Sequence, residues 1–263
     1  MERVAGDMVM KDMVMEDMRA KEMNAKKHGE VGSQVRRSAI RQARPQAAGD
    51  VRDLLAAGQI AVIPTDTVYG IIADPRSQTG LDRLFAAKQR PRAKTVQILC
   101  SDVSQARKLG LIFPRIYCDL LAEFPEGSVC LVCPVKDDCQ LVTTRQEDGY
   151  RTQAVRFPAS QQAKEIISLA GAVAASSANR SGDQSATTVK EAVAKLGDSV
   201  PLYLDGGATP GPVASTVITV DEASMRQIRD GSQPTKPQLR ILRQGTAAES
   251  DIQDWLESWN GRA

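Results

Sequence analysis

The chain has almost no histidine, because the only one among its 263 residues is His28. This residue lies in an N-terminal segment without aromatic residues, so a catalytic histidine or a histidine-based metal site in the folded part is nearly excluded. Aromatic residues make up only 4% of the sequence, which disfavours a surface that stacks nucleic-acid bases. No apolar run approaches the roughly 18 residues that cross a bilayer, so no membrane association is expected.

Neither sign of charge is in large excess. The 34 basic and 32 acidic residues leave a net charge of +2, which excludes a strongly basic, histone-like binder but leaves room for a local basic patch. With 42% hydrophobic residues, the composition is that of an ordinary globular protein that can fill a core.

Cysteine is also scarce, and two of the five cysteines form the pair Cys130-x-x-Cys133. Such a pair can belong to a zinc site, but no second pair or nearby histidine completes four ligands. The segment from Val129 to Cys133 has the pattern of a buried strand, in which cysteine acts as a small hydrophobic residue. Core packing is therefore the favoured interpretation, and without a secretion signal we expect a reduced, cytoplasmic chain.

Residues 1–49 differ from the rest of the chain. They hold seven of the eight methionines and no aromatic residue, and the sequence Asp-Met-Val-Met begins at Asp7 and again at Asp12. A five-residue repeat matches neither the helical period of about 3.6 nor the strand period of 2. We therefore predict a flexible tail at 1–49, whose acidic residues argue against a mitochondrial transit peptide.

From residue 50 onward, strand-like and helix-like segments alternate. Strands are predicted at 60–63, 96–100, 129–133, 154–157, 173–175, 202–204 and 216–220, and helices at 51–57, 81–88, 160–169, 187–196 and 251–259. This order predicts one α/β domain at 50–247 with a twisted open mixed sheet flanked by helices, followed by a C-terminal helix within 248–263. Ligands of such sheets bind where loops leave the strand ends.

The first polar cluster at a strand end is Pro-Thr-Asp-Thr-Val-Tyr-Gly at 64–70. Its hydroxyl groups can donate and accept hydrogen bonds, which suits a small polar ligand. In the alternative interpretation, Thr65 and Asp66 only cap a turn. The pattern alone favours neither.

The second cluster is basic, with five basic and no acidic residues between Arg83 and Ser101. A solvated helix face usually mixes both signs, so this segment predicts an anionic partner such as a triphosphate or a nucleic-acid backbone. Lys88 would supply a point charge, and the fork of Arg90 could grip two phosphate oxygens. No P-loop sequence occurs in the chain.

Two further clusters contain small residues. In the segment 174–182, a strand of small residues opens into serine, asparagine and glycine, where backbone amides can approach an anion closely. No histidine is available to activate Ser177, which disfavours a serine hydrolase. The segment 205–217 likewise leads from a flexible loop into a strand.

Taken together, these segments resemble the YrdC-like threonylcarbamoyl-AMP synthase family. The matching motifs are Thr-Asp-Thr-Val-Tyr-Gly at 65–70, Lys-Gln-Arg-Pro at 88–91, Ser-Ala-Asn-Arg-Ser-Gly at 177–182 and Ser-Thr-Val at 215–217. The resemblance covers about residues 50–245 and corresponds to the short form of the family. It implies synthesis of threonylcarbamoyl-AMP and pyrophosphate from L-threonine, bicarbonate and ATP, for threonylcarbamoyladenosine modification of tRNA with a separate transferase partner.

The resemblance also implies residue roles. Lys88 and Arg90 would be catalytic residues at the ATP phosphates. The expected L-threonine site consists of Thr67, Arg156, Ala175 and Ser215. The expected ATP site consists of Arg90, Lys94, Thr152, Ser177, Asn179, Ser185 and Arg229, with Arg243 as the alternative to Arg229. Arg156 also has a direct physical rationale, since its planar fork matches the carboxylate of an amino acid.

The chain departs from the family pattern in three places. Thr95-Val96 replaces Pro-Leu, residues 126–130 replace Pro-Gly-Pro-Leu-Thr, and Leu99 stands where some members have a histidine. The phosphate and carboxylate partners are kept, so these changes bear on efficiency more than on the basic activity. Mg²⁺ is expected with ATP, held largely by phosphate oxygens and water, and no metal site built by the protein is predicted. Asp66 is the only nearby acid, with a turn cap as its favoured role.

Two other functions remain open on the sequence alone. A YrdC-like module could bind tRNA or double-stranded RNA through the basic segment without any synthesis, although that segment has no aromatic residue for base stacking. A related enzyme could use another amine or carbamoyl phosphate, which would normally involve extra domains. Synthesis of threonylcarbamoyl-AMP is the favoured interpretation.

Overall fold

The computed structural model describes residues 38–147, 149–211 and 213–261. Residues 1–37, which make up most of the predicted tail, lie outside the described residues. Within the described ranges, no helix combines the length and the apolar character that crossing a bilayer requires.

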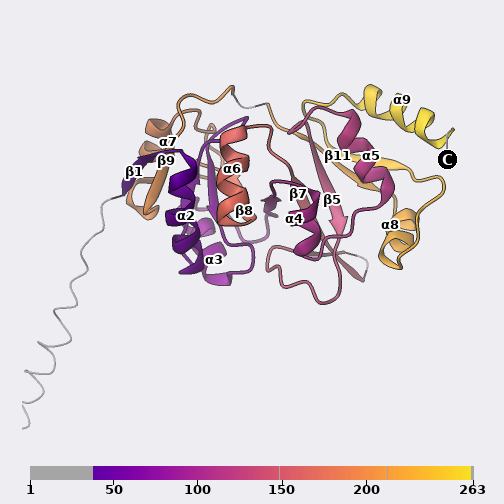
Figure 1. Cartoon of the computed structure of the whole chain (residues 1–263), viewed down its shortest axis with the longest axis horizontal. Coiled ribbons are helices and arrows are strands. Elements are labelled where there is room, and N and C mark those ends of the chain that lie inside the picture. The colour runs from indigo at the N-terminus through magenta and orange to yellow at the C-terminus, as the bar shows by residue number, and fades with distance from the viewer. Residues whose placement is uncertain (1–37, 148, 212, 262–263) are drawn as a thin grey trace, which may run out of the picture. The chain divides into compact units, whose positions relative to one another are not determined.

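The described strands form one mixed sheet, and helices alternate with them along the chain (Figure 1). The strands are β1 (Ala39–Gln42), β2 (Ala61–Ile63), β3 (Gly70–Ala73), β4 (Gln97–Leu99), β5 (Val129–Pro134), β6 (Arg145–Glu147), β7 (Tyr150–Arg156), β8 (Val173–Ser177), β9 (Leu202–Asp205), β10 (Thr216–Val220) and β11 (Leu239–Arg243). Their spatial order is β1-β9-β2-β3-β8-β4-β7-β5-β10-β11, and β6 pairs with β7 beside this path. The predicted α/β class with a mixed open sheet is confirmed.

The helices follow the apolar spacing of their sequences. They are η1 (Pro45–Ala47), α2 (Ala48–Ala56), α3 (Gln78–Ala87), α4 (Val103–Lys108), α5 (Arg115–Glu123), α6 (Gln161–Ala170), α7 (Val189–Leu196), η2 (Gly197–Ser199), α8 (Glu222–Arg229) and α9 (Glu249–Asn260). Several begin at a hydroxyl side chain that accepts a hydrogen bond from the first turn. Ser77 caps α3, Ser160 caps α6 and Thr188 caps α7, which satisfies backbone donors that have no partner within the helix.

Among the described residues, the helices cover both faces of one half of the sheet but only one face of the other half. Around β2, β3, β8 and β9, one face packs against α3 and α7 and the opposite face against α2 and α6. Around β5, β7 and β10, one face packs against α4, α5 and α8. Along β5, Leu131 points into that core while its neighbour Cys130 faces the other side, as the two-residue period of a strand requires.

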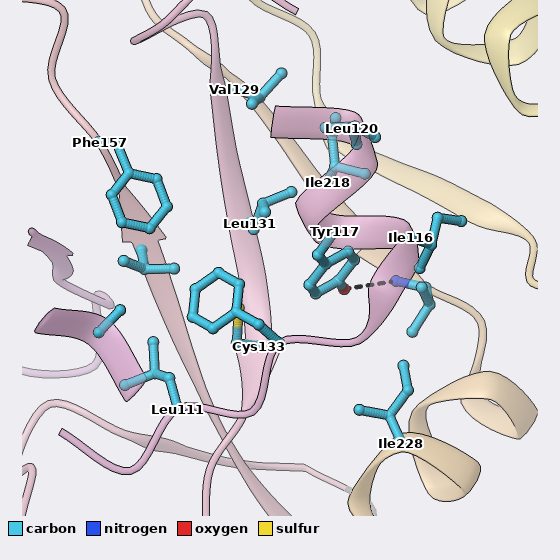
Figure 2. Packing of buried hydrophobic residues seen from close by; sticks show 14 of the residues in the cluster. Leu111, Ile116, Tyr117, Leu120, Val129, Leu131, Cys133, Phe157, Ile218 and Ile228 are labelled. Atoms are coloured by element: carbon cyan, nitrogen blue, oxygen red, sulfur yellow. Dashed lines mark hydrogen bonds between the residues drawn. The ribbon is translucent and has the colours of Figure 1, made fainter. Parts of the chain in front are cut away.

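The core behind this second half is tightly organised around Tyr117 of α5 (Figure 2). Its buried hydroxyl donates to the carbonyl of Val132 at 2.9 Å and accepts from the backbone amide of Val220 at 3.2 Å. One side chain thereby joins β5 to β10. Because an unpaired buried hydroxyl would be costly, these two bonds favour a fixed spacing between the strands.

The C-terminal helix belongs to the same core. Ile252 and Leu256 of α9 are buried in it, and the indole nitrogen of Trp259 donates to the carboxylate of Asp119 on α5 at 2.9 Å. The helix predicted within 248–263 is therefore present, and it packs on the domain predicted to end at 247.

The prediction of a flexible tail at 1–49 is wrong for residues 39–49, which are among the described residues and form regular structure. Residues 39–42 form β1, which pairs in parallel with β9, and Ala43 and Ala47 are buried in the core beside α2. The prediction also missed β3, β6, β11, α4, α5 and α8. Short segments such as α4 contain too few apolar residues to define a period, and β1 is exposed along its whole length, so neither carries a clear pattern.

A chain that begins at Ala48 is expected to unfold more readily than a chain that begins at Ser38. It lacks the backbone pairing of β1 with β9 and the buried side chains of Ala43 and Ala47. At roughly 0.5–1.5 kcal/mol for each hydrogen bond, partly offset by the entropy of an edge strand, we expect a loss of about 1 kcal/mol. Urea unfolding of both chains measures it, and equal midpoints would contradict a stabilising role for β1.

Candidate active site

A cavity of about 380 Å³ lies on the face of β5, β7 and β10 that carries no helix in the described structure. Cys130, Ala154, Arg156 and Val217 point into it from these strands. Their immediate neighbours, such as Leu131 and Val155, face the hydrophobic core instead. The remaining lining residues are Thr67, Val68, Arg90, Thr95, Gln97, Ala175, Ser176, Ser177, Ser185, Val213, Ala214, Ser215 and Arg243.

The turn after β2 forms one wall of this cavity. The hydroxyl of Thr65 donates to the carbonyl of Val68 at 2.6 Å and accepts from the backbone amides of Thr67 and Val68. Its oxygen also lies 3.2 Å from the hydroxyl of Thr67. Thr65 therefore closes the turn, and Thr67 lines the cavity.

Tyr69, in the same turn, holds the start of the loop that connects β9 to β10. Its hydroxyl donates to the carbonyl of Gly207 at 2.6 Å and accepts from the amide of Gly206 at 3.1 Å. Tyr69 is fully buried, and this burial raises the pKa of its phenol. The far end of the loop supplies Val213, Ala214 and Ser215 to the cavity.

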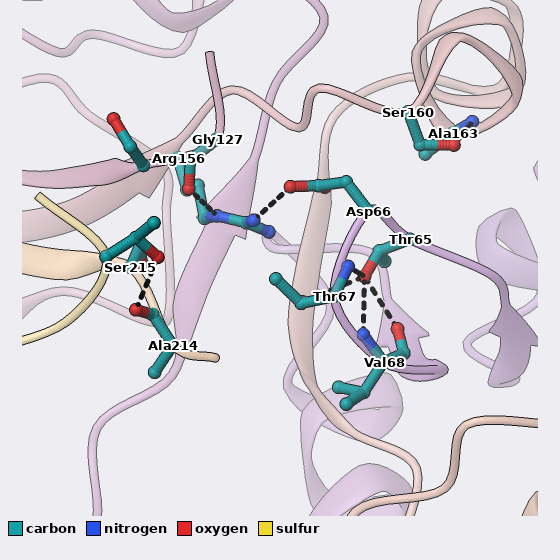
Figure 3. A network of polar contacts seen from close by, with 12 residues as sticks. Thr65, Asp66, Thr67, Val68, Gly127, Arg156, Ser160, Ala163, Ala214 and Ser215 are labelled. Atoms are coloured by element: carbon teal, nitrogen blue, oxygen red, sulfur yellow. Dashed lines mark hydrogen bonds and ion pairs between the residues drawn. The ribbon is translucent and has the colours of Figure 1, made fainter. Parts of the chain in front are cut away.

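Arg156 ends β7 and is held from two sides (Figure 3). Its Nε donates to the carbonyl of Gly127 at 3.0 Å, and its Nη2 forms a hydrogen-bonded ion pair with the carboxylate of Asp66. The side chains of Arg156 and Asp66 are only 4% and 15% exposed. The predicted turn-capping role of Asp66 is therefore wrong, because Thr65 caps the turn and Asp66 binds the arginine.

Gly127 is required at this point by the close approach of its neighbours. Its φ is +76°, in the left-handed region, and an added Cβ would overlap the carboxylate of Asp66 and crowd the guanidinium of Arg156. Only glycine combines this backbone conformation with so little space. Within 126–130, Gly127 is the position that keeps the glycine of the family's Pro-Gly-Pro-Leu-Thr, and the ion pair needs it.

The end of α3 places Arg90 at the cavity. The amide of Arg90 donates to the carbonyl of Phe85 at 2.9 Å, and that of Gln89 to the carbonyl of Ala86 at 3.0 Å, which is a Schellman motif. Gln89 occupies the left-handed position with a φ of +49°, a conformation that costs a non-glycine residue about 1 kcal/mol. Such strain is common where a loop is shaped by function.

The guanidinium of Arg90 has no acidic partner among the described residues. Its Nη2 donates to the carbonyl of Thr95 at 3.0 Å, while its Nε is buried without a partner there. Burial lowers the pKa of Arg90, although an arginine remains charged at any ordinary pH. The cation is therefore available to an anion in the cavity.

Lys88 is buried beneath the loop that follows β8 and is only 1% exposed. Its ammonium group donates to the carbonyl of Ser177 and, at 2.6 Å, to that of Asn179. Burial and the neighbouring Arg90 lower the pKa of Lys88 to about 8. The ammonium thus lies behind Ser177, which lines the cavity, and does not itself line it.

Asn179 also stabilises this loop. Its side-chain amide donates to the carbonyls of Arg180 and Asp183 at 2.7 and 2.8 Å, so the chain turns back on itself at this residue. Asn179 does not line the cavity. Lys88 and Asn179 were both predicted to contact ATP. In the structure their side chains instead donate hydrogen bonds to backbone carbonyls of the segment 177–183.

Arg243 and not Arg229 lies at the cavity. Arg243 of β11 donates to the carbonyl of Ser215 at 3.0 Å, which brings it to the start of β10. Arg229 lines a different cavity of about 620 Å³ and pairs with Asp230 at 3.0 Å. Of the two predicted arginines, the alternative thus lies at this cavity, because β11 and not the end of α8 lies next to β10.

Two further predicted residues lie away from the cavity. Lys94 lines a smaller cavity of about 200 Å³ on the other side of the basic segment. Thr152 is buried farther along β7, opposite Pro134. The structure does bring the other predicted residues together at the cavity, namely Thr67, Arg90, Arg156, Ala175, Ser177, Ser185 and Ser215.

Sequence reasoning missed Gln97, Cys130, Ala154 and Val217 at the cavity floor. Their signal was the alternation of the strands, since each lies one residue away from a core position. Cys130 is buried but faces the cavity, and burial raises the pKa of its thiol to about 11. Core packing describes Cys100, Cys133 and Cys139 correctly, and the described residues contain no cluster of side chains that could hold a metal ion.

No carboxylate side chain lines the cavity within the described residues. Three arginines do, and only Arg156 has an acidic partner there, whereas Arg90 and Arg243 donate to carbonyls. The cavity therefore contains one arginine whose charge is neutralised by an acidic residue and two arginines whose charges are not. This arrangement suits a ligand with several negative charges beside a smaller one with a single carboxylate.

The family model Sua5/YciO/YrdC, described as "Telomere recombination", matches residues 53–231. The chain belongs to this family. The predicted family is thus confirmed, and the match includes all four sequence motifs.

Several relatives within the family carry a specific name. A putative threonylcarbamoyl-AMP synthase of Mycobacterium tuberculosis is 32% identical over 186 residues, which are 71% of this chain and 84% of that protein. A threonylcarbamoyl-AMP synthase of Pyrococcus abyssi is 33% identical over 197 residues, which are 74% of this chain but 56% of that protein. The chain therefore resembles the shorter relative over most of that protein's length.

The fold also matches solved structures of the family. The structure of Pyrococcus abyssi Sua5 complexed with L-threonine has a TM-score of 0.68 and 26% identity, and the match covers 82% of this chain and 60% of that one. Escherichia coli YciO matches with a TM-score of 0.63 and 17% identity over 80% of this chain and 97% of that one, which supports the fold alone.

Proposed function

We propose that this chain makes threonylcarbamoyl-AMP and pyrophosphate from L-threonine, bicarbonate and ATP. Relatives in the Sua5/YciO/YrdC family that carry the name threonylcarbamoyl-AMP synthase support the proposal. The observation that carries the proposal is the charge pattern of the cavity. The guanidinium of Arg156 forms an ion pair with an acidic residue. Arg90 and Arg243 have no acidic partner among the described residues. An enzyme with this activity would be a nucleotidyltransferase.

Arg156 would bind the carboxylate of L-threonine. Its Nε and Nη2 are occupied by Gly127 and Asp66, and Nη1 has no hydrogen bond among the described residues. Nη1 can then donate to a carboxylate oxygen in the cavity. Thr67, Ala175 and Ser215 line the cavity around it and would complete the amino-acid site.

Arg90 and Arg243 would bind the triphosphate. Each is a delocalised cation with several donors, and neither is neutralised by a carboxylate among the described residues. Ser177 and Ser185 would line the nucleotide beside them. Lys88 and Asn179 would contribute indirectly, because their hydrogen bonds stabilise the loop 177–183. The ammonium of Lys88 would also add positive charge close to the phosphates.

The chemistry needs no covalent intermediate on the protein. The threonine amine attacks the carbon of bicarbonate, which gives a carbamate and releases water. A carbamate oxygen then attacks the α-phosphorus of ATP, and the bond to pyrophosphate breaks with its electron pair leaving on the pyrophosphate oxygen. Arginines placed around the phosphates would stabilise charge in this step, and catalysis would consist mainly of positioning and electrostatics.

Mg²⁺ would enter with ATP and would neutralise part of the phosphate charge. The cavity offers hydroxyl groups but no carboxylate among its described lining residues, which fits an ion held mainly by phosphate oxygens and water. Asp66 would not be a ligand, because it pairs with Arg156.

The remaining parts of the proposal concern partners and location. The product would pass to a separate transferase that modifies tRNA, and contacts with tRNA or double-stranded RNA would use the basic segment around Arg92. The cytoplasm would be the place of this reaction. These expectations follow from the family resemblance.

Release of pyrophosphate tests the proposed activity. The purified chain is incubated with ATP, Mg²⁺ and bicarbonate, with and without L-threonine, and the nucleotide product is identified by mass spectrometry. We expect release that depends on L-threonine and a product with the mass of threonylcarbamoyl-AMP. ATP binding without such a product would favour a nucleotide- or RNA-binding module in place of a synthase.

ATP affinity is expected to fall by about threefold between pH 7.5 and 8.5, because Lys88 loses its proton around pH 8. Above that pH, Lys88 of the free protein is mostly deprotonated. Binding of the phosphates must then be accompanied by protonation of Lys88, which lowers the observed affinity for ATP. Calorimetric titration of ATP at several pH values measures this change. The Lys88→Met variant should bind ATP with a flat profile in this range, and Lys94→Met should keep the wild-type profile. A wild-type profile in Lys88→Met would assign the change to another group.

A further inference from the structure

The ion pair between Asp66 and Arg156 is the most deeply buried one among the described residues. Burying two charges is costly unless they compensate each other and make further hydrogen bonds. The carboxylate of Asp66 is compensated by Arg156 alone. Its other oxygen, Oδ1, is buried and has no hydrogen-bond partner among the described residues. The pair therefore calls for an explanation beyond the stability of the turn.

We infer that Asp66 is a positioning residue that presets the guanidinium of Arg156 for the carboxylate of the amino-acid substrate. This inference rests on the proposed function. A free arginine side chain loses rotamer entropy when it becomes ordered. Asp66 and the carbonyl of Gly127 order it before any ligand arrives, so the substrate does not have to.

The geometry of the fork supports this assignment. Asp66 and Gly127 occupy Nη2 and Nε, which form one edge of the planar guanidinium, so Nη1 is the nitrogen left without a hydrogen bond among the described residues. Cys130 lies opposite Arg156 on β5, and Leu99 lies beside it on β4. Neither side chain offers a second anion that could hold the guanidinium in place of Asp66.

Asp66 also tunes the charge of the amino-acid part of the cavity. Pairing makes the Arg156 end nearly neutral, while Arg90 and Arg243 keep their full charge. A triphosphate is then attracted mainly to the two unpaired arginines. The amino-acid carboxylate binds the already ordered guanidinium of Arg156, around which the positive potential is weaker. A change at Asp66 leaves these two arginines as they are, so it is expected to affect the amino-acid part of the cavity more than the binding of ATP.

Calorimetric titration with L-threonine and with L-threoninamide, which lacks the carboxylate charge, tests the inference. The variant Asp66→Asn is expected to bind L-threonine about threefold to tenfold more weakly, while its affinity for L-threoninamide and for ATP stays within about twofold of wild type. Glu126→Gln is the matched control, because Glu126 adjoins Gly127 but pairs with Lys164 at the surface. It should bind all three ligands like the wild type.

A double-mutant cycle locates the effect. In a chain that already carries Arg156→Ala, the further change Asp66→Asn should alter L-threonine affinity by less than about 1.5-fold. Asp66 acts by positioning the guanidinium of Arg156, and that guanidinium is absent in this variant. If Asp66→Asn does not fold, Asp66→Glu keeps the charge but displaces the carboxylate, and the same selective loss of L-threonine affinity is expected.

The outcomes are separable. Unchanged L-threonine affinity in Asp66→Asn or Asp66→Glu, equal losses for L-threonine and L-threoninamide, or additive losses in the cycle would each overturn the positioning role and leave the proposed function standing. A wild-type chain that binds no L-threonine, with or without a non-hydrolysable ATP analogue, would overturn both.

Discussion

Arg156→Lys is expected to weaken L-threonine binding by about tenfold or more, which corresponds to roughly 1.5 kcal/mol for the loss of a charge-assisted hydrogen bond. The guanidinium contacts Gly127 and Asp66 at the same time. The single ammonium of lysine cannot reach both and still present a donor to a carboxylate. Calorimetric titration of L-threonine into wild type and variant measures the loss.

The same strand offers a matched control for this change. Arg151 also belongs to β7, but it donates to the carbonyl of Cys139 and lines the larger cavity beside Arg229. Arg151→Lys should therefore leave L-threonine affinity unchanged. If Arg156→Lys lowers the melting temperature but keeps its L-threonine affinity, Arg156 serves only to hold the strands together.

Arg90→Ala is expected to raise the ATP concentration needed for half-maximal activity by about 10- to 100-fold, from the loss of roughly 1.5–3 kcal/mol of charge-assisted binding. The Schellman motif at the end of α3 directs this side chain to the cavity, and no acid among the described residues compensates it. L-threonine affinity in the absence of nucleotide should change little. Initial rates of pyrophosphate release at varied ATP, together with calorimetry, measure both quantities.

Arg92 provides the control for Arg90. It lies two residues away in the same basic segment, but it is 71% exposed and pairs with Asp82. Arg92→Ala removes the same charge from the neighbourhood and should leave the ATP requirement within about twofold of wild type, since an exposed ion pair contributes little. Similar losses in both variants would mean that only the general charge of the segment matters.

The short-range part of the fold was accessible from the sequence. The strands around Val62, Leu131 and Val155 are short apolar runs between turn residues, and the helices at α3, α6 and α7 begin at serine or threonine caps. The segments that were missed lack such signals. β1 is fully exposed and is a strand only because β9 offers it an open edge, which no local pattern reveals.

The candidate site was predictable where one residue type has one evident use. An arginine at the end of an apolar strand and a basic segment without acids indicated Arg156 and Arg90, and the structure brings both to one cavity. The roles of Lys88 and Asn179 were less accessible, because the same ammonium or amide group can bind a ligand or the carbonyls of its own loop. The structure places both on the carbonyls of the loop after β8.

The sequence by itself determined the family, the α/β class and the kinds of chemical group at the site, because motifs and alternation are properties of neighbouring residues. Only the tertiary structure decided which distant residues meet. It places Arg243 at the cavity and Arg229 outside it, since β11 returns beside β10. It also pairs Asp66 with Arg156 across 90 positions of the chain, and a contact of that kind depends on how the strands pack and not on the spacing of residues.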